Sequence, residues 1–326
     1  MLSNTWPELP HPVSRIGLGC ARLTGGMGLK QSASVIEAAL DAGVTHFDTA
    51  PSYGFGTSEA ALGRILQGSR NTTIATKVGI RARGNGNLMS AARMLLRPLV
   101  AQLPGLRARI GRSLAPPKTD THDHFDLNFV RSSIEQSMLT LGRDRLDVLL
   151  LHEPSSRPEE ALIEYLASMQ QQGGIGLYGI GTGLELKSSP AIGDVVQHRW
   201  SPVNPLRGKR DILHGALRWW LPTFGEVISE LRRDNKQVFD RFAFDASDDR
   251  NLAGLLLTFA LRDAPNSTFL ISSNDPNRIR AITKAIDWRF VASAQEGDDQ
   301  TYSAIKAGLV SKIGLSHLPT TPTLSL

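Results

Sequence analysis

Cysteine and long hydrophobic runs are the scarce features of this sequence. Its 326 residues include one cysteine, Cys20, so no disulfide can form within the chain, and this is typical of a reducing compartment. The longest apolar run, residues 252–261, is too short to span a bilayer and suits a buried helix. Residues 1–14 lack the apolar core of a signal peptide. We therefore expect a cytoplasmic protein with no membrane partner.

Acidic residues are absent from one segment. Residues 81–118 contain seven arginines and one lysine but no Asp or Glu, in a chain whose net charge is +5. Within this segment, residues 89–100 have the pattern of a basic amphipathic helix, which can bind a membrane surface or nucleic acid. The alternative is an arginine-rich lid whose charges are solvated or paired with acids elsewhere. We favour the lid, and we expect no nucleic-acid partner.

A G-x-G-x-x-G turn is also missing near the start of the chain, where short β-like runs instead alternate with helical patterns. The eight strand candidates are residues 15–20, 44–49, 72–78, 146–152, 176–181, 194–200, 237–242 and 268–272. Such alternation implies parallel pairing, and eight units predict a closed (β/α)8 TIM barrel, a single α/β domain over residues 1–326. A doubly wound sheet is the alternative, and the missing turn counts against it.

Two stretches exceed the usual length of a βα loop. Residues 79–126, a long basic insertion after the third strand, and residues 202–226 each follow a predicted strand end. Loops of this length in a compact domain are usually functional or disordered. In a barrel both would overhang the catalytic face, so we expect them to set specificity.

Three successive predicted strands each deliver an ionisable side chain at the same end. Asp48 ends one strand and is followed by Tyr53, Lys77 ends the next, and His152 ends the third. Taken singly, each is more often a capped or solvated residue, and Asp48 with Lys77 could be a structural ion pair. All four at the end of a barrel where active sites form predict a catalytic site.

These side chains suit the reduction of a carbonyl. Hydride transfer to the carbonyl carbon builds negative charge on its oxygen, which needs a nearby proton donor. A free tyrosine has a pKa of about 10 and donates sluggishly at neutral pH, whereas a close ammonium stabilises the phenolate and lowers that pKa. We expect Lys77 to act in this way on Tyr53, while Asp48 holds Lys77. His152 can then hydrogen-bond the substrate oxygen and orient it.

The run FDTAPSYGFGTSEAALG at residues 47–63, with Lys77 and LLLHEP at residues 149–154, resembles the aldo-keto reductase superfamily. The resemblance extends over nearly the whole chain. It implies that Asp48, Tyr53, Lys77 and His152 are a catalytic tetrad, and that NADPH (NADP+) serves to interconvert an aldehyde, ketone or sugar and its alcohol. The wording of the two motifs is most similar to bacterial members that act on sugars and small aldehydes.

The same resemblance implies a set of cofactor contacts. The residues it assigns are Gly19, Cys20, Asp48, Thr182, Gln197, Arg241, Ser272, Ser273 and Arg278. Gln197 would hydrogen-bond the nicotinamide amide, and Arg241 stands where the family places an aromatic residue or an arginine against the cofactor. Gly183 departs from the pattern, because it cannot replace the family's asparagine amide.

Residues 271–278 resemble the family's adenosine-phosphate loop, with Ser273 and Arg278 placed to grip the 2′-phosphate of NADPH. An arginine fork can hold a dianion bidentately. The alternative is an ordinary helix start, with Asp275 as cap, Pro276 in the first turn and Arg278 solvated. Both can hold at once, since helix N-termini favour phosphate. Ser272 replaces the usual lysine, and Ala281 and Ile282 replace the adenine contacts.

The sequence gives less information about the substrate pocket and about alternative functions. Ala21 stands where the family often has a large aromatic residue, so we expect a roomier pocket, filled by Trp200, Trp219 or Trp220, unless the last two pack within their own helix. One rival is a non-catalytic, nucleotide-sensing regulatory subunit, which would not need Tyr53. Another is a metal-dependent hydrolase, but we see no clustered His and Asp ligands and expect no metal. The substrate, the direction of reaction and the oligomeric state stay open.

Overall fold

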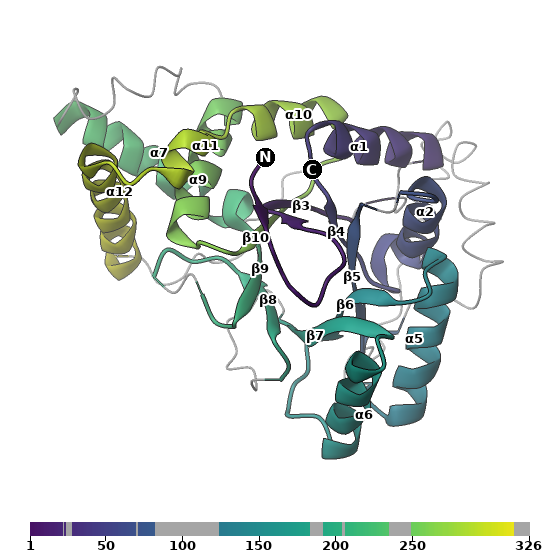
Figure 1. Ribbon diagram of the computed structural model, residues 1–326. Helices are drawn as coiled ribbons and strands as arrows, with labels where there is room; N and C mark the ends of the chain where they lie inside the picture. The colour runs from purple at the N-terminus through teal and green to yellow at the C-terminus, as the bar shows by residue number, and fades with distance from the viewer. Residues whose placement is uncertain are drawn as a thin grey trace, which may run out of the picture.

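A closed barrel of eight parallel strands forms the centre of the protein (Figure 1). This computed structural model describes residues 1–21, 23, 28–69, 71–81, 124–182, 192–203, 206–234 and 249–315. The strands lie in the order β10-β3-β4-β5-β6-β7-β8-β9. Their bounds are β3 (Ile16–Gly19), β4 (His46–Asp48), β5 (Thr73–Val78), β6 (Leu146–His152), β7 (Ile175–Gly181), β8 (Val195–Arg199), β9 (Arg210–His214) and β10 (Thr268–Ile271). The predicted (β/α)8 barrel is confirmed.

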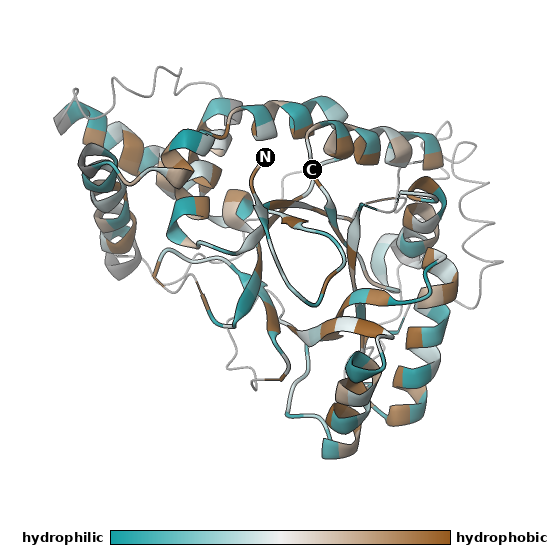
Figure 2. Cartoon of the chain, in the orientation of Figure 1, coloured by the Kyte–Doolittle hydropathy of each residue, from teal (hydrophilic) through white to brown (hydrophobic). Residues whose placement is uncertain are grey.

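Helices surround the barrel and cover its apolar outer face (Figures 1 and 2). They are α1 (Leu29–Asp41), α2 (Ser58–Ile65), α5 (Leu127–Leu141), α6 (Glu160–Gln171), α7 (Ala216–Asp234), α9 (Asp249–Asp263), α10 (Pro276–Lys284), α11 (Trp288–Ala292) and α12 (Glu296–Leu315). Helix α1 packs against α10, α2 against α5, and α7 against both α9 and α12. No helix in the described part of the chain has the length and hydrophobicity needed to cross a membrane.

One predicted element is wrong. Residues 202–226 were expected to be a long loop, but they contain β9 and the start of α7. In the connection from β8 to β9, the described residues 200–203 and 206–209 form no helix. The strand candidate at residues 237–242 lies outside the described residues, as does all of the basic segment except Arg81, whose guanidinium stacks 5.0 Å from the Phe129 ring centroid.

A hairpin at the start of the chain closes one end of the barrel. Strands β1 (Ser3–Asn4) and β2 (Val13–Ser14) pair antiparallel, and the loop between them crosses the barrel (Figure 1). Its apolar side chains join those of the barrel interior in one cluster: Trp6, Leu9, Val13, Ala75, Val148, Leu150, Leu177, Val195 and Ile212. At the rim, Arg210 donates to both carboxylate oxygens of Glu8, each at 2.7 Å. Only the end at which the strands finish is left open for a site.

Close packing of α2 on α5 depends on Gly63. A Cβ at this position would lie 2.5 Å from the carbonyl oxygen of Thr140 and 2.9 Å from the Cα of Leu141. Both are backbone atoms, so they cannot move aside as a flexible side chain could. This contact fixes α2, the helix that carries the end of the 47–63 motif.

We predict that Gly63→Ala destabilises the fold by about 1–3 kcal/mol, because overpacking outweighs the better helix propensity of alanine. Gly297→Ala is the matched control, since Gly297 lies in α12 and a Cβ there would meet no atom within 4 Å. That control should be neutral or more stable by up to about 1 kcal/mol. Equilibrium denaturation measures both, and equal effects would contradict the packing argument.

Candidate active site

The 47–63 motif is held in place by buried hydroxyl groups. The Thr49 hydroxyl donates to Ser58 Oγ at 3.0 Å, and Ser58 Oγ donates to the carbonyl oxygen of Cys20 at 3.0 Å. The Thr76 hydroxyl donates to Glu59 Oε1 at 2.6 Å. These bonds tie the start of α2 to β4, β5 and the residue after β3. Ser58 and Glu59 of the motif therefore support the residues that precede them.

Lys77 and Asp48 form a buried ion pair at the open end of the barrel. Lys77 Nζ donates to Asp48 Oδ1 at 2.6 Å and to the Thr49 carbonyl oxygen at 2.8 Å. The amide nitrogen of Gln197, from the opposite side of the barrel, donates to the same Asp48 oxygen at 2.6 Å. Lys77 is 1% exposed and Asp48 3% exposed. Two charges so far from water are tolerable only because both are paired.

Tyr53 lies over this pair. Lys77 Nζ lies 4.7 Å from the centroid of the Tyr53 ring, close enough for its positive charge to act on the phenol. The His152 ring stands edge-on to it, with ring centroids 5.8 Å apart and an interplanar angle of 82°. The structure thus brings together all four residues that the sequence predicts to be catalytic.

Burial governs the protonation of Tyr53. It raises the pKa of the phenol above its usual value, and the opposing charge of Lys77 does not cancel this effect. The expected lowering by Lys77 is therefore present but outweighed. Burial also acts to lower the pKa of Lys77, yet Asp48 and Tyr53 more than compensate and raise it. At neutral pH the site holds a neutral phenol beside an ammonium, the forms that a proton donor and its stabilising cation require.

The residue after His152 has an unusual backbone. Glu153 adopts a left-handed φ of 55°, and its N–H donates to the carbonyl oxygen of Gly181 at 2.7 Å. Such a conformation costs a non-glycine residue about 1–3 kcal/mol, and it is common at functional sites. It ends β6 abruptly behind His152 and places the Glu153 carboxylate within electrostatic range of Tyr53.

Sequence reasoning missed His214, which ends β9. Its register partner on β8 is Arg199. Burial lowers the pKa of His214 to about 4, so the imidazole is neutral at neutral pH. The run Ile212-Leu213-His214 repeats the pattern of apolar residues ended by histidine that marks β6, and this signal could have located it. Arg241, which lies on the strand candidate at residues 237–242, is outside the described residues.

The predicted cofactor residues near β3 are already engaged with the backbone. Ser272 Oγ donates to the Gly19 carbonyl oxygen at 2.9 Å. A Cβ on Gly19 would lie only 2.5 Å from Ser272 Oγ. The Cys20 side chain is fully buried, and its N–H donates to the Asp48 carbonyl oxygen at 2.8 Å. The N–H of Thr182 donates to the Gln197 carbonyl oxygen at 2.8 Å. Gly183 is not among the described residues.

The start of α10 has the predicted cap. Asp275 accepts a hydrogen bond from the N–H of Asn277 at 2.9 Å, and Pro276 begins the helix. Ser273 Oγ accepts from the N–H of Asp275 at 3.0 Å. Arg278 is exposed and makes no ion pair with any residue that the structure describes. A capped helix start with a free arginine is a ready site for an anion.

Two of the tryptophans expected to fill the pocket pack elsewhere. Trp200 is fully buried in the core between barrel and helices, 6.0 Å from Trp220 and 6.2 Å from Phe259 between ring centroids. Trp220 Nε1 donates to the Trp200 carbonyl oxygen at 3.0 Å. Trp219, in the first turn of α7, lies beside Arg199. Over the described ranges, no group of three His, Cys, Asp or Glu side chains could hold a metal ion.

Comparison with known proteins gives the family of the chain. The model of the Aldo/keto reductase family matches residues 15–186. A D-threo-aldose 1-dehydrogenase from Pseudomonas sp. is 31% identical over 150 residues, which are 45% of this chain and 40% of that protein. A pyridoxal 4-dehydrogenase from Microbacterium luteolum is 31% identical over 159 residues, 43% of this chain and 40% of that one. The chain thus matches about two fifths of the length of these relatives.

Solved structures share the fold over the whole chain. A glycerol dehydrogenase from Gluconobacter oxydans superposes with a TM-score of 0.65 at 18% identity, covering 99% of both chains. An aldo-keto reductase from Bacillus halodurans in its holo form gives 0.63 at 17% identity, covering 95% of this chain and 96% of the other. At such identities the likeness concerns the fold alone.

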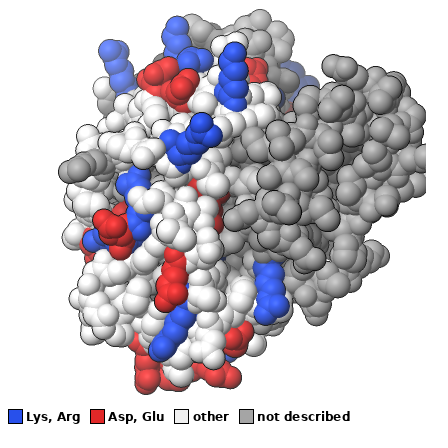
Figure 3. Space-filling view, turned by 90° about the vertical axis from the view of Figure 1, so that its right-hand side faces the viewer, with Lys and Arg blue, Asp and Glu red and all other residues white. Residues whose placement is uncertain are grey.

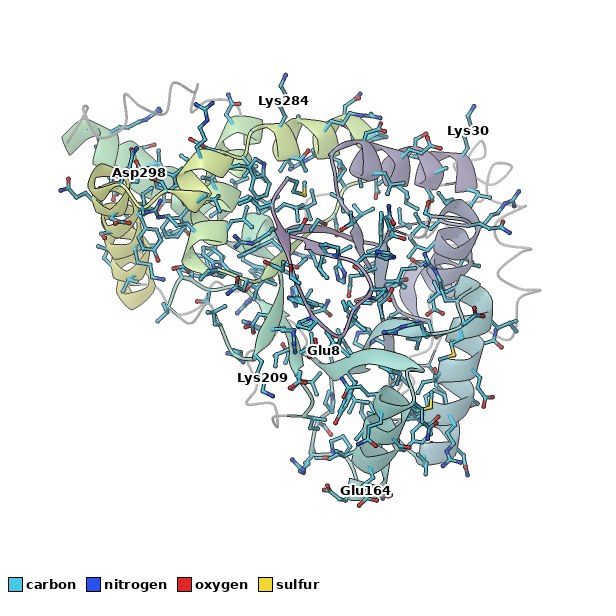
Figure 4. The ribbon with its side chains drawn as sticks, in the orientation of Figure 1. Glu8, Lys30, Glu164, Lys209, Lys284 and Asp298 are labelled. Carbon is cyan, nitrogen blue, oxygen red and sulfur yellow. The ribbon has the colours of Figure 1, made fainter. Side chains whose placement is uncertain are left out.

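We predict that Lys77→Met destabilises the protein by about 3–5 kcal/mol, because it leaves the Asp48 carboxylate buried without its cation. Lys209→Met is the matched control. Lys209 bonds Asp194 at 2.7 Å, but its side chain is 78% exposed and projects outward (Figure 4). Its loss should cost at most about 1 kcal/mol. Urea denaturation measures the free energy of unfolding of both variants. Similar decreases would show that burial does not determine how much the Lys77–Asp48 pair contributes to stability.

Proposed function

The chain belongs to the aldo/keto reductase family, and we propose that it is an NADPH-dependent oxidoreductase that interconverts a carbonyl compound and an alcohol. The observation that carries this proposal is the buried network that joins Tyr53, Lys77 and Asp48 beside His152. A module that only sensed nucleotide would have no use for a neutral phenol held against a buried ammonium.

The proton chemistry follows from the protonation states. NADPH, when bound, supplies the hydride that reduces the carbonyl carbon. The Tyr53 hydroxyl gives its proton to the carbonyl oxygen as negative charge develops there, and Lys77 stabilises the phenolate left behind. His152 orients the carbonyl oxygen toward Tyr53. In the reverse direction the phenolate takes the proton of the alcohol, so the same residues serve oxidation.

The described residues offer a fitting cradle for the cofactor. Arg278 and Ser273, at the capped start of α10, would hold the 2′-phosphate, and Ser272 with Gly19 would line the approach to it. Gln197 and Thr182 would contact the nicotinamide. His214, at the end of the seventh barrel strand, would lie against the nicotinamide.

The substrate we propose is a small aldehyde, ketone or sugar, or the corresponding alcohol. This is supported by the names of the relatives, which include an aldose dehydrogenase and a pyridoxal dehydrogenase. On the face shown in Figure 3, basic and acidic side chains of the described residues are interspersed, as suits a partner that is a small molecule rather than nucleic acid or membrane. With its single, buried Cys20, the chain fits a cytoplasmic enzyme.

We predict that Tyr53→Phe lowers kcat by about 10²- to 10⁴-fold, because the proton donor is lost while the ring remains. NADPH should still bind, as measured by fluorescence titration. Tyr178→Phe is the control, since Tyr178 packs on the outer face of β7, and it should keep full activity on an aldehyde panel followed by NADPH absorbance. Near-normal turnover by Tyr53→Phe would sink the assignment. Cofactor binding by the wild type without turnover on any carbonyl would favour a nucleotide sensor.

We predict that Arg278→Ala weakens NADPH binding by about 10- to 100-fold, the loss of one or two charge-assisted hydrogen bonds, and leaves NADH binding unchanged. Arg280→Ala is the control, because Arg280 lies on the same helix but pairs with Asp41 at 3.0 Å. It should affect neither cofactor. Tighter binding of NADH than of NADPH by the wild type would refute the proposed preference.

A further inference from the structure

Arg199 lies at the open end of the barrel and on its inner side. Side chains alternate between the two faces of a strand, and Gln197, two residues earlier on β8, reaches inward to Asp48. The outward positions are taken by His198, which bonds Asp211, and by Trp200, which lies in the outer core. Arg199 therefore shares the inner face with Gln197, about 6.6 Å further along the strand toward the mouth. Its neighbour across the ladder is His214.

The guanidinium of Arg199 packs on an aromatic ring but has no acidic partner among the described residues. It lies 4.9 Å from the centroid of the Trp219 ring. Within the described ranges it makes no ion pair and no side-chain hydrogen bond. Burial lowers its pKa, and the nearby charge of Arg207 lowers it further.

Two other arginines among the described residues, Arg15 and Arg210, have protein acceptors. Arg15 donates to the carbonyl oxygens of Leu261 and Ala264 at 2.6 and 2.9 Å. Arg210 bonds Glu8 at 2.7 Å. Arg199 is only partly buried and has no such acceptor among the described residues, so its N–H donors remain available to a ligand.

The backbone is shaped to keep Arg199 against Trp219. Gly215 joins β9 to α7 with a left-handed φ of 77°. A Cβ there would lie 2.9 Å from Trp219 Cδ1 and 3.3 Å from Arg199 Cγ. Glycine thus permits both the turn and the stacking. The N–H donors of a guanidinium lie in its own plane. Stacking of that plane on an aromatic ring therefore leaves the donors free for a ligand.

We propose that Arg199, held on Trp219, binds an anionic group, a carboxylate or a phosphate, of a ligand that enters the open end of the barrel. This rests on the proposed function, because the ligand is either the substrate or the cofactor of the same site. The guanidinium fork matches the oxygens of either anion, and neutral His214 beside it adds no competing charge.

The test compares Arg199→Gln with the wild type on two aldehydes that differ by one carboxylate, 4-oxobutanoate and butanal. If the substrate carries the anion, kcat/KM for 4-oxobutanoate falls by about 10- to 100-fold and that for butanal is unchanged. If the cofactor carries it, the Kd of NADPH rises by a similar factor, and both aldehydes are turned over normally at saturating NADPH. Unchanged values in both arms would overturn the proposal.

Arg218→Gln is the matched control. Arg218 lies 5.5 Å from the same Trp219 ring but is exposed on α7, so its loss should change neither arm. Arg199→Lys provides a second variant: it keeps the charge without the planar fork and should give an intermediate loss. Melting temperatures establish that each variant is folded.

A direct binding measurement separates this proposal from the proposed reaction. Inorganic pyrophosphate is titrated into the wild type, Arg199→Gln and Arg218→Gln by calorimetry, with no turnover required. Weaker binding by Arg199→Gln alone supports the subsite even if the wild type reduces neither aldehyde, an outcome that would count only against the reductase function. Equal affinity in all three proteins, together with unchanged kinetics, rejects the subsite.

Discussion

The ion pair between Lys77 and Asp48 is the interaction on which the rest of the site depends. Neither group has access to water, so each must be fully compensated by protein. Asp48 Oδ1 accepts from Lys77 and from Gln197, and Lys77 also donates to the Thr49 carbonyl oxygen. Because Gln197 comes from the opposite side of the barrel, its bond to Asp48 connects β8 to β4 across the barrel interior. The same ammonium lies 4.7 Å from the centroid of the Tyr53 ring, so in the proposed reaction its placement would decide how the phenol responds to a substrate.

The N-terminal hairpin helps to exclude water from the Lys77–Asp48 pair. The N-terminal hairpin inserts Trp6, Leu9 and Val13 into the lower end of the barrel, where they pack on the inner side chains of the strands. Water is thereby excluded from that end of the barrel. At the open end, the burial of Tyr53 itself raises the pKa of the phenol more than Lys77 can lower it. Tyr53 is thus kept protonated by burial, and in the proposed reaction Lys77 would stabilise the phenolate only once the proton has left.

How much the sequence could predict depended on whether the signal was local. Strand β6 was found because LDVLLLH is apolar throughout, as burial on both faces requires. Strand β9 was missed because Arg210 and Asp211 read as a loop, while their partners, Glu8 and His198, are distant in sequence or separated by a turn. The tetrad was predicted from motifs at strand ends. The bond from Gln197 to Asp48 and the position of His214 were not, because contacts across a barrel depend on its register and closure.

The charges that remain around the mouth are arranged unevenly, and this gives a bound ligand a direction. Lys77 is neutralised by Asp48, while Tyr53 and His214 are uncharged at neutral pH. Arg199, at the end of β8, contributes positive charge on the side of the barrel opposite β4, the strand that Tyr53 follows. In the proposed subsite, an anionic group of a ligand would be attracted to Arg199. A ligand with a carbonyl at one end and an anion at the other would therefore enter with its reacting carbon toward Tyr53, an orientation that a neutral ligand would have to gain from packing alone.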